Sequence, residues 1–160
     1  MADTAEKNKL MRRFVSTILA ATLLLASVTV WGDGFGKAAD CPKTLEKEAL
    51  DVASTLRGWG ALHTAYMRFG ACDDGAVAEG FTESVVRILA DKWTTVKNLG
   101  RFVKMDPSFL RFVYNHIDAT ADPKDIQRIR NNLKRPGCPK GNRRVCREIE
   151  LAVTRTLEEI

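Results

Sequence analysis

The sequence predicts an all-α fold, a compact antiparallel bundle of five or six helices stapled by disulfides. Apolar residues recur at three- and four-residue spacing in successive segments, a pattern typical of helices with one buried face. A sustained two-residue alternation rich in β-branched residues is missing, so strands are not expected. The connections between the segments are short, which favours antiparallel neighbours. The 160 residues suffice for one domain with a real core.

The first 32 residues have the layout of a secretory signal peptide. A positively charged start precedes Phe14–Trp31, which is 18 residues long and carries no charge. An uncleaved membrane anchor is the alternative, because about 20 apolar residues span a bilayer. We expect a loose leader over residues 33–43 and a single helical domain over 44–160. The protein is thus predicted to be exported, periplasmic or secreted, and membrane-anchored if the N-terminal segment is uncleaved.

Four cysteines, Cys41, Cys72, Cys138 and Cys146, follow the predicted signal. An even count after export predicts two disulfides in an oxidising compartment. No pair has the short spacing of a structural zinc site, so no metal is expected. Cys138 and Cys146 enclose seven residues and can meet easily. Cys41 can reach Cys72 only if the intervening helical run folds into a hairpin, because a straight 26-residue helix is about 39 Å long. We favour Cys138–Cys146 together with Cys41–Cys72. The alternative, which a straight helix would favour, ties Cys72 to the loop that contains Cys138 and Cys146.

Helices are expected in order along the chain. Residues 44–69 carry one apolar stripe, interrupted at Gly58-Trp59-Gly60, where the glycines either bend the helix or bring a neighbour close. A further helix is expected near 92–104. Asp106-Pro107 and Asp122-Pro123 are start signals, an N-cap acid followed by proline at the first helical position. Residues 134–142 form a loop by composition, and the last helix spans about 143–158.

Residues 70–93 combine a turn, an acidic cluster and a clear helical pattern. Asp73-Asp74-Gly75 predicts a turn in which either aspartate caps the next helix. Six apolar residues with helical spacing then predict a buried face: Val77, Phe81, Val85, Ile88, Leu89 and Trp93. Gly80 lies inside this pattern, where it either lets another helix approach closely or marks a kink.

The acidic residues of this stretch form the predicted binding surface. Glu79 and Glu83 are four residues apart and therefore share one helix face, about a turn from Asp73 and Asp74. The apolar stripe fixes that face outward. We therefore expect Asp73, Asp74, Glu79 and Glu83 to contact a basic protein partner. A solvated helix face with no partner is the alternative explanation of the same acids.

Catalytic and cofactor motifs are missing from the sequence. It contains no Gly-rich phosphate loop, no G-x-S-x-G, no H-E-x-x-H and no EF-hand pattern. Only two histidines occur, and His63 is expected to be a partly buried structural residue. No catalytic residue, metal or cofactor is therefore predicted. The enzyme alternative is a small envelope hydrolase using Glu79 or the Asp73/Asp74 pair, in a cleft that these carboxylates would share with His63.

A basic segment, Lys124 to Arg147, contains nine bases against one acid, Asp125. The bases are Lys124, Arg128, Arg130, Lys134, Arg135, Lys140, Arg143, Arg144 and Arg147. After export, an anionic envelope surface is a more suitable partner for this segment than nucleic acid, and no nucleic-acid partner is predicted. Such a segment is also typical of a solvated face.

Together these features favour an exported, non-enzymatic helical domain that acts by protein–protein binding. In size and compartment it is analogous to inhibitors and immunity proteins that neutralise toxins in the bacterial envelope, an analogy that carries no residue-level support. Besides the hydrolase, the other alternative is a peripheral membrane protein held by the N-terminal anchor and the basic segment.

Overall fold

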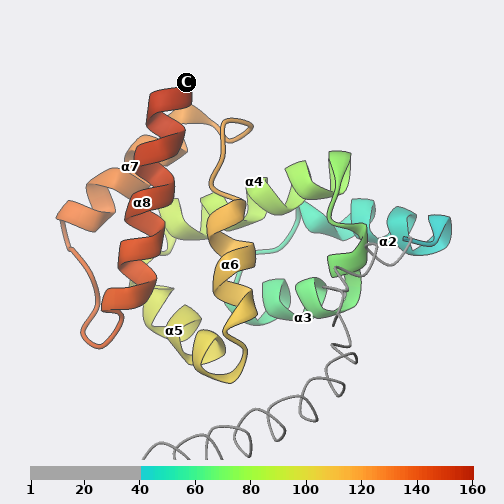
Figure 1. The fold of residues 1–160 in the computed structure, drawn as a ribbon, viewed down its shortest axis with the longest axis horizontal. Coiled ribbons are helices and arrows are strands. Elements are labelled where there is room, and N and C mark those ends of the chain that lie inside the picture. The colour runs from blue at the N-terminus through green and yellow to red at the C-terminus, as the bar shows by residue number, and fades with distance from the viewer. Residues whose placement is uncertain (1–40) are drawn as a thin grey trace, which may run out of the picture. The chain divides into compact units, whose positions relative to one another are not determined.

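Seven α-helices and two short 3-10 helices make up residues 41–160, the part of the chain that the computed structural model describes (Figure 1). The α-helices are α2 (Lys43–Ala53), α3 (Trp59–Phe69), α4 (Gly75–Asp91), α5 (Val96–Met105), α6 (Ser108–Asn115), α7 (Pro123–Lys134) and α8 (Arg143–Glu159). The 3-10 helices are η1 (Gly70–Cys72) and η2 (Trp93–Thr95). These residues contain no strand, so the predicted all-α fold is confirmed. The predicted signal peptide and most of the leader lie outside the described residues.

Helix α4 lies at the centre of the packing. The six apolar residues whose spacing predicted a buried face are all buried, five on α4 and Trp93 on η2. Helices α2 and α7 pack against α4, and α8 packs against α7 and α6. In Figure 1, α4 runs across the view while α6 and α8 rise past it. Each large apolar side chain buried in this way contributes roughly 1.5–3 kcal/mol to folding.

Gly80 allows α2 to approach α4 closely. A Cβ at this position would lie 2.8 Å from the Cβ of Ala53 and 3.1 Å from the backbone nitrogen of Ser54. Helix α4 continues without a break through Gly80, so close approach explains this glycine and a kink does not. The contact is reinforced by Ser84, whose buried hydroxyl donates to the Ala53 carbonyl and accepts from the Leu56 amide at 3.2 Å.

The run predicted as an interrupted helix over 44–69 is two helices, which is why seven helices form where five or six were expected. The break lies at residues 54–58, upstream of the predicted point, and Trp59 and Gly60 open α3. Its cause is tertiary: Ser84 on α4 binds backbone groups on both sides of the end of α2. The Gly58-Trp59-Gly60 pattern therefore marks the start of a helix and not a bend within one.

Both disulfides have the pairing that the sequence favoured. The turn between α2 and α3 brings Cys41 back to Cys72, with a Cα–Cα distance of 4.9 Å. Cys138 and Cys146 close the short loop before α8 at 5.9 Å. The Asp122-Pro123 start signal is confirmed, because Asp122 caps α7 and accepts from the Lys124 amide at 2.8 Å. At the other signal, α6 begins one residue later than predicted, at Ser108, with Pro107 at the N-cap position, although Asp106 still accepts from the Ser108 amide at 3.0 Å.

Candidate functional site

Four carboxylates from two distant parts of the chain line one groove of about 570 Å³. Glu79 and Glu83 come from α4, whereas Asp122 and Asp125 come from the N-terminal end of α7. Arg87 is the only base in the lining. We call this the acidic groove. It exists because α7 packs along α4, which carries the start of α7 to the exposed face of α4.

Two of these four acids are already paired with arginines. Glu83 forms an ion pair with Arg87 one turn further along α4. Asp125 pairs with Arg128 at 2.6 Å, and Arg128 also reaches Asp91. Glu79 and Asp122 have exposed carboxylates without an ion-pair partner among the described residues, although Asp122 caps α7. Glu79 and Asp122 are therefore the carboxylates available to a cationic group from outside.

The two aspartates predicted to share this surface have other contacts. Asp74 caps α4, where its Oδ1 accepts from the Gly75 amide at 2.8 Å. Gly75 has a φ of +49°, a left-handed conformation that favours glycine. Neither aspartate lines the acidic groove. The expected four-acid surface is thus represented in the groove by Glu79 and Glu83 only.

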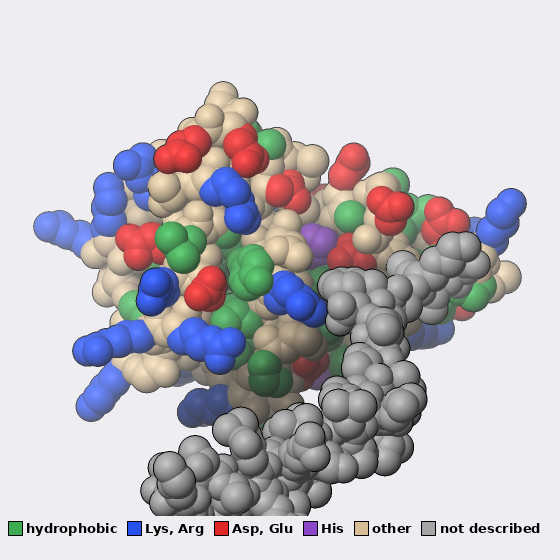
Figure 2. Space-filling view, in the orientation of Figure 1, with side chains coloured by type: hydrophobic (Ala, Val, Ile, Leu, Met, Phe, Trp, Pro, Cys, Tyr) green, Lys and Arg blue, Asp and Glu red, His purple; other side chains and the backbone are tan. Residues whose placement is uncertain are grey.

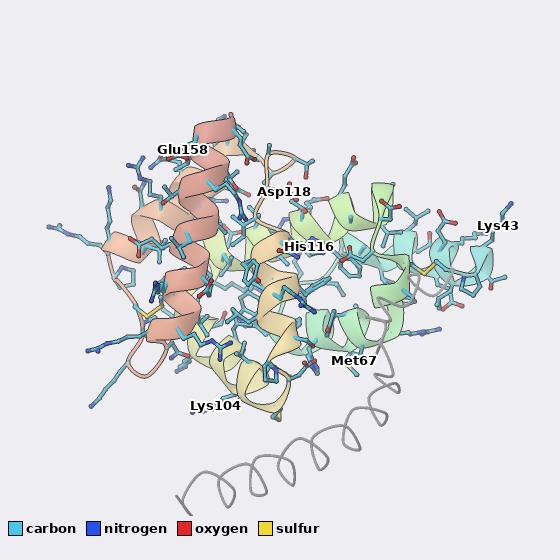
Figure 3. All side chains as sticks on the ribbon, viewed as in Figure 1. Lys43, Met67, Lys104, His116, Asp118 and Glu158 are labelled. Carbon is cyan, nitrogen blue, oxygen red and sulfur yellow. A yellow bond between two sulfur atoms is a disulfide. The ribbon has the colours of Figure 1, made fainter. Side chains whose placement is uncertain are left out.

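Asp73 faces the interior, where it meets His116 at the C-terminal end of α6. The Asp73 Oδ1 and His116 Nε2 atoms lie 3.2 Å apart, and both are buried. This distance is within ion-pair range, but the pair does not satisfy hydrogen-bond angles, so we describe it as an electrostatic contact. The ring of His116, which is labelled in Figure 3, stacks on Phe81 and meets Phe112 edge-on. Asp73 therefore ties the turn before α4 to α6, a structural role.

His63 is a partly buried residue within an aromatic cluster, as expected. Its Nε2 lies 3.3 Å from Asp106 Oδ2, and its ring contacts Phe102 and Phe109. Hydrogen bonds from the Ser108 side chain, and to a lesser degree from His63 and the Ser108 amide, hold the pKa of Asp106 below its ordinary value. Ser108 donates to Asp106 and not to His63, so these residues do not have the order of a catalytic triad.

The nine bases of the basic segment are all exposed. Figure 2 shows blue side chains gathered at the left edge of the view, where α7 and α8 lie, and red side chains at the upper right, over α4 and α2. Arg128 is the one base of the nine with an ion-pair partner among the described residues. The segment thus forms a second charged surface, of opposite sign to the acidic groove.

The residues of the hydrolase alternative are not brought together. His63 lies beside Asp106 and, like Asp73 and Asp74, does not line the groove that contains Glu79. Glu79 is exposed, whereas a carboxylate that serves as a general acid is usually held in an apolar pocket. Within residues 41–160, no three His, Cys, Asp or Glu side chains lie close enough to hold a metal ion.

Sequence analysis missed Asp122 and Asp125 as groove residues. Asp122 is the N-cap acid of a helix-start signal that the sequence did reveal, and Asp125 lies three residues further on, but nothing local to residues 122–125 indicates that they lie beside Glu79. The described helices also include none that is long and apolar enough to cross a bilayer. Comparisons with protein-family models, curated proteins and solved structures found no match to this chain.

Proposed function

We propose that this chain is an exported, non-enzymatic binding protein whose acidic groove receives a basic segment of another protein. The observation that carries the proposal is the convergence of Glu79, Glu83, Asp122 and Asp125 on one groove with a single base in its lining. Glu79 and Asp122 offer free carboxylates, and Glu83 can exchange Arg87 for an arginine or lysine of the partner. An inhibitor or immunity-type protein of the envelope would act in this way.

The scaffold beneath the groove suits a rigid binding surface. Gly80 lets α2 pack closely on α4, and Ser84 bonds α4 to the end of α2. The Cys41–Cys72 disulfide holds the turn that precedes α4. A preorganised acidic surface raises the association rate and selects partners more than it raises affinity. Glu79 and Glu83 are exposed, so they contribute little to folding.

Export is supported by the predicted signal peptide and by the two disulfides, which persist in oxidising compartments. We expect a mature chain that begins between residues 33 and 40 and contains no free thiol. The intact mass of the protein from its own cells, measured after alkylation without reduction, tests this expectation. Two or more alkylated cysteines in the native mature protein would contradict it.

The binding proposal is tested by charge reversal in the groove. The double variant Glu79→Lys/Glu83→Lys should lose a basic partner that the wild-type protein captures from its own cells. Association should slow by about tenfold or more at low salt, and the loss should shrink as ionic strength rises, because exposed charges are screened beyond about 10 Å at 0.1 M salt. Quantitative mass spectrometry identifies the partner, and surface plasmon resonance with that partner gives the rates.

The matched control is Glu158→Lys/Glu159→Lys, which makes the same change in charge at the exposed C-terminal end of α8 (Figure 3). This control should keep the partner. If both double variants slow association equally, net charge alone is responsible and the groove is not the site. If the groove variant folds and binds with an unchanged association rate, the proposal is wrong.

A further inference from the structure

A second groove, of about 580 Å³, lies between the start of α3 and the segment from η2 through α5. Its apolar lining comes from Trp59, Phe102 and Met105. The indole N–H of Trp59 donates to Thr95 Oγ1 at 2.9 Å, which fixes the ring as a wall of the groove. Met105 is 71% exposed, an unusual position for a large apolar side chain. We call this the apolar groove.

The charged residues that line the apolar groove are all bases: Arg57, Lys92 and Arg101. None of them forms an ion pair with a carboxylate in the described part of the chain. Lys92 donates to the Arg57 carbonyl at 2.7 Å, so one cation is held close to the groove. An apolar floor with an unpaired cationic rim is complementary to a molecule that is apolar along its length and anionic at one end.

Gly58 and Gly60 leave space open in this groove, although neither has a backbone conformation that requires glycine. Gly58 is extended, with a φ of −172°, and a Cβ there would meet nothing within 4 Å. A Cβ on Gly60 would meet only Phe102 Cζ, at the ordinary contact distance of 3.7 Å. Alanine at residue 60 would favour the helix more than glycine does. What glycine provides at both positions is empty space beside Trp59.

We infer that the apolar groove binds a single-chain anionic amphiphile, such as a fatty acid, with its chain against Trp59, Phe102 and Met105 and its anionic group at the rim. The volume lies within the range of about 300–1,000 Å³ that is typical of small-molecule sites. The continuous apolar floor beside three bases that are unpaired among the described residues, and not the size of the groove, favours an amphiphile as the occupant.

Isothermal titration calorimetry with decanoate tests the inference on the mature protein. We expect saturable binding with a stoichiometry of one. Decyltrimethylammonium, which has the same chain with a cationic head, should bind at least about tenfold more weakly because it meets the basic rim. Acetate, the anionic group alone, should show no measurable binding because it buries no chain. Equal binding of decanoate and decyltrimethylammonium would overturn the assignment of the rim.

Variants then locate the site. Gly60→Leu fills the groove and should weaken decanoate binding about tenfold, since a displaced chain loses the burial of roughly two methylenes. Ala61→Leu, at an exposed neighbouring position outside the groove, is its control and should change binding less than about twofold. Arg101→Glu should weaken binding, and Arg147→Glu, an equivalent reversal outside the groove, should not.

Absence of saturable decanoate binding by a folded protein, or unchanged binding by Gly60→Leu, would show that the groove is not a ligand site. Binding to anionic phospholipid vesicles is measured separately, by sedimentation. If vesicles bind wild type and Gly60→Leu equally while free decanoate fails to bind, the bases serve a membrane surface and the small-ligand site does not exist.

Discussion

The acidic groove and the apolar groove are nearly equal in volume, about 570 and 580 Å³, yet they have opposite chemistry. The first is lined by four acids and one base, and the second by three bases and an apolar floor. They also use glycine differently. At Gly80, in the acidic groove, the space that a side chain would need is occupied by backbone and side-chain atoms at the end of α2. At Gly60, in the apolar groove, that space is open.

The packing of the fold requires glycine at residue 80 but not at residue 60. At Gly80 the neighbouring atoms are backbone and a short side chain of α2, which cannot move aside cheaply. At Gly60 nothing in the packing excludes a side chain. Folding does not need glycine at residue 60, and a better helix former would fit there. We therefore attribute Gly60 to ligand binding.

Alanine at each glycine should therefore have opposite effects on stability. Gly80→Ala should destabilise the protein by about 1–3 kcal/mol, because the new Cβ overpacks the α2–α4 contact. Gly60→Ala should stabilise it by up to about 1 kcal/mol through helix propensity. Urea unfolding followed by circular dichroism measures both changes. Effects of the same sign would remove the contrast between the two grooves.

Two acids from the same predicted surface should also behave differently. Asp73→Ala removes the electrostatic contact with the buried His116 ring and should cost about 1–3 kcal/mol. Glu79→Ala removes an exposed acid and should change stability by less than about 0.5 kcal/mol. The same unfolding experiment compares them, and equal costs would place Glu79 in a structural role like that of Asp73.

Asp106 lies behind the apolar groove, because its partner His63 packs on Phe102. Asp106→Ala should cost about 1 kcal/mol at neutral pH, because the Ser108 amide at the start of α6 loses its acceptor. The folded protein holds the pKa of Asp106 below its unfolded value of 3.8, so this stabilisation is present above pH 3.8. It should disappear as the pH falls through the lower folded pKa.

The control for this pH dependence is Asp106→Asn. Asparagine keeps an acceptor for the Ser108 amide but has no carboxylate to titrate, so its stability difference from the wild-type protein should also narrow on acidification. Unfolding free energies measured between pH 3 and 7 compare the three proteins. A stability gap for Asp106→Ala that stays constant down to the acid limit would show that the charge of Asp106 contributes nothing.

Local patterns in the sequence predicted much of this fold. The buried face of α4, the caps at Asp74 and Asp122, and the favoured cysteine pairing all follow from spacing and residue type over a few turns. These features are set by interactions between near neighbours in the chain. Sequence reasoning therefore identified the helices, and it placed Glu79 and Glu83 on a common exposed face.

What sequence reasoning missed depends on contacts between distant residues. The break after α2 is set by Ser84, 28 residues from Leu56, and Asp73 turns inward because His116 approaches it from α6. The acidic groove needs α7 to pack along α4, and the apolar groove needs α5 to lie beside the start of α3. Helical periodicity identifies the face that is buried but not the helix that covers it.

The central claim is that two separate grooves take ligands of opposite character, and crossed binding measurements test it most directly. An octalysine peptide and decanoate would each be titrated into wild type, Glu79→Lys/Glu83→Lys and Gly60→Leu. Each variant should weaken its own ligand by about tenfold and the other ligand by less than about twofold, because the two grooves share no lining residue. If both variants weaken both ligands alike, or neither variant weakens either ligand, the two-groove account is contradicted.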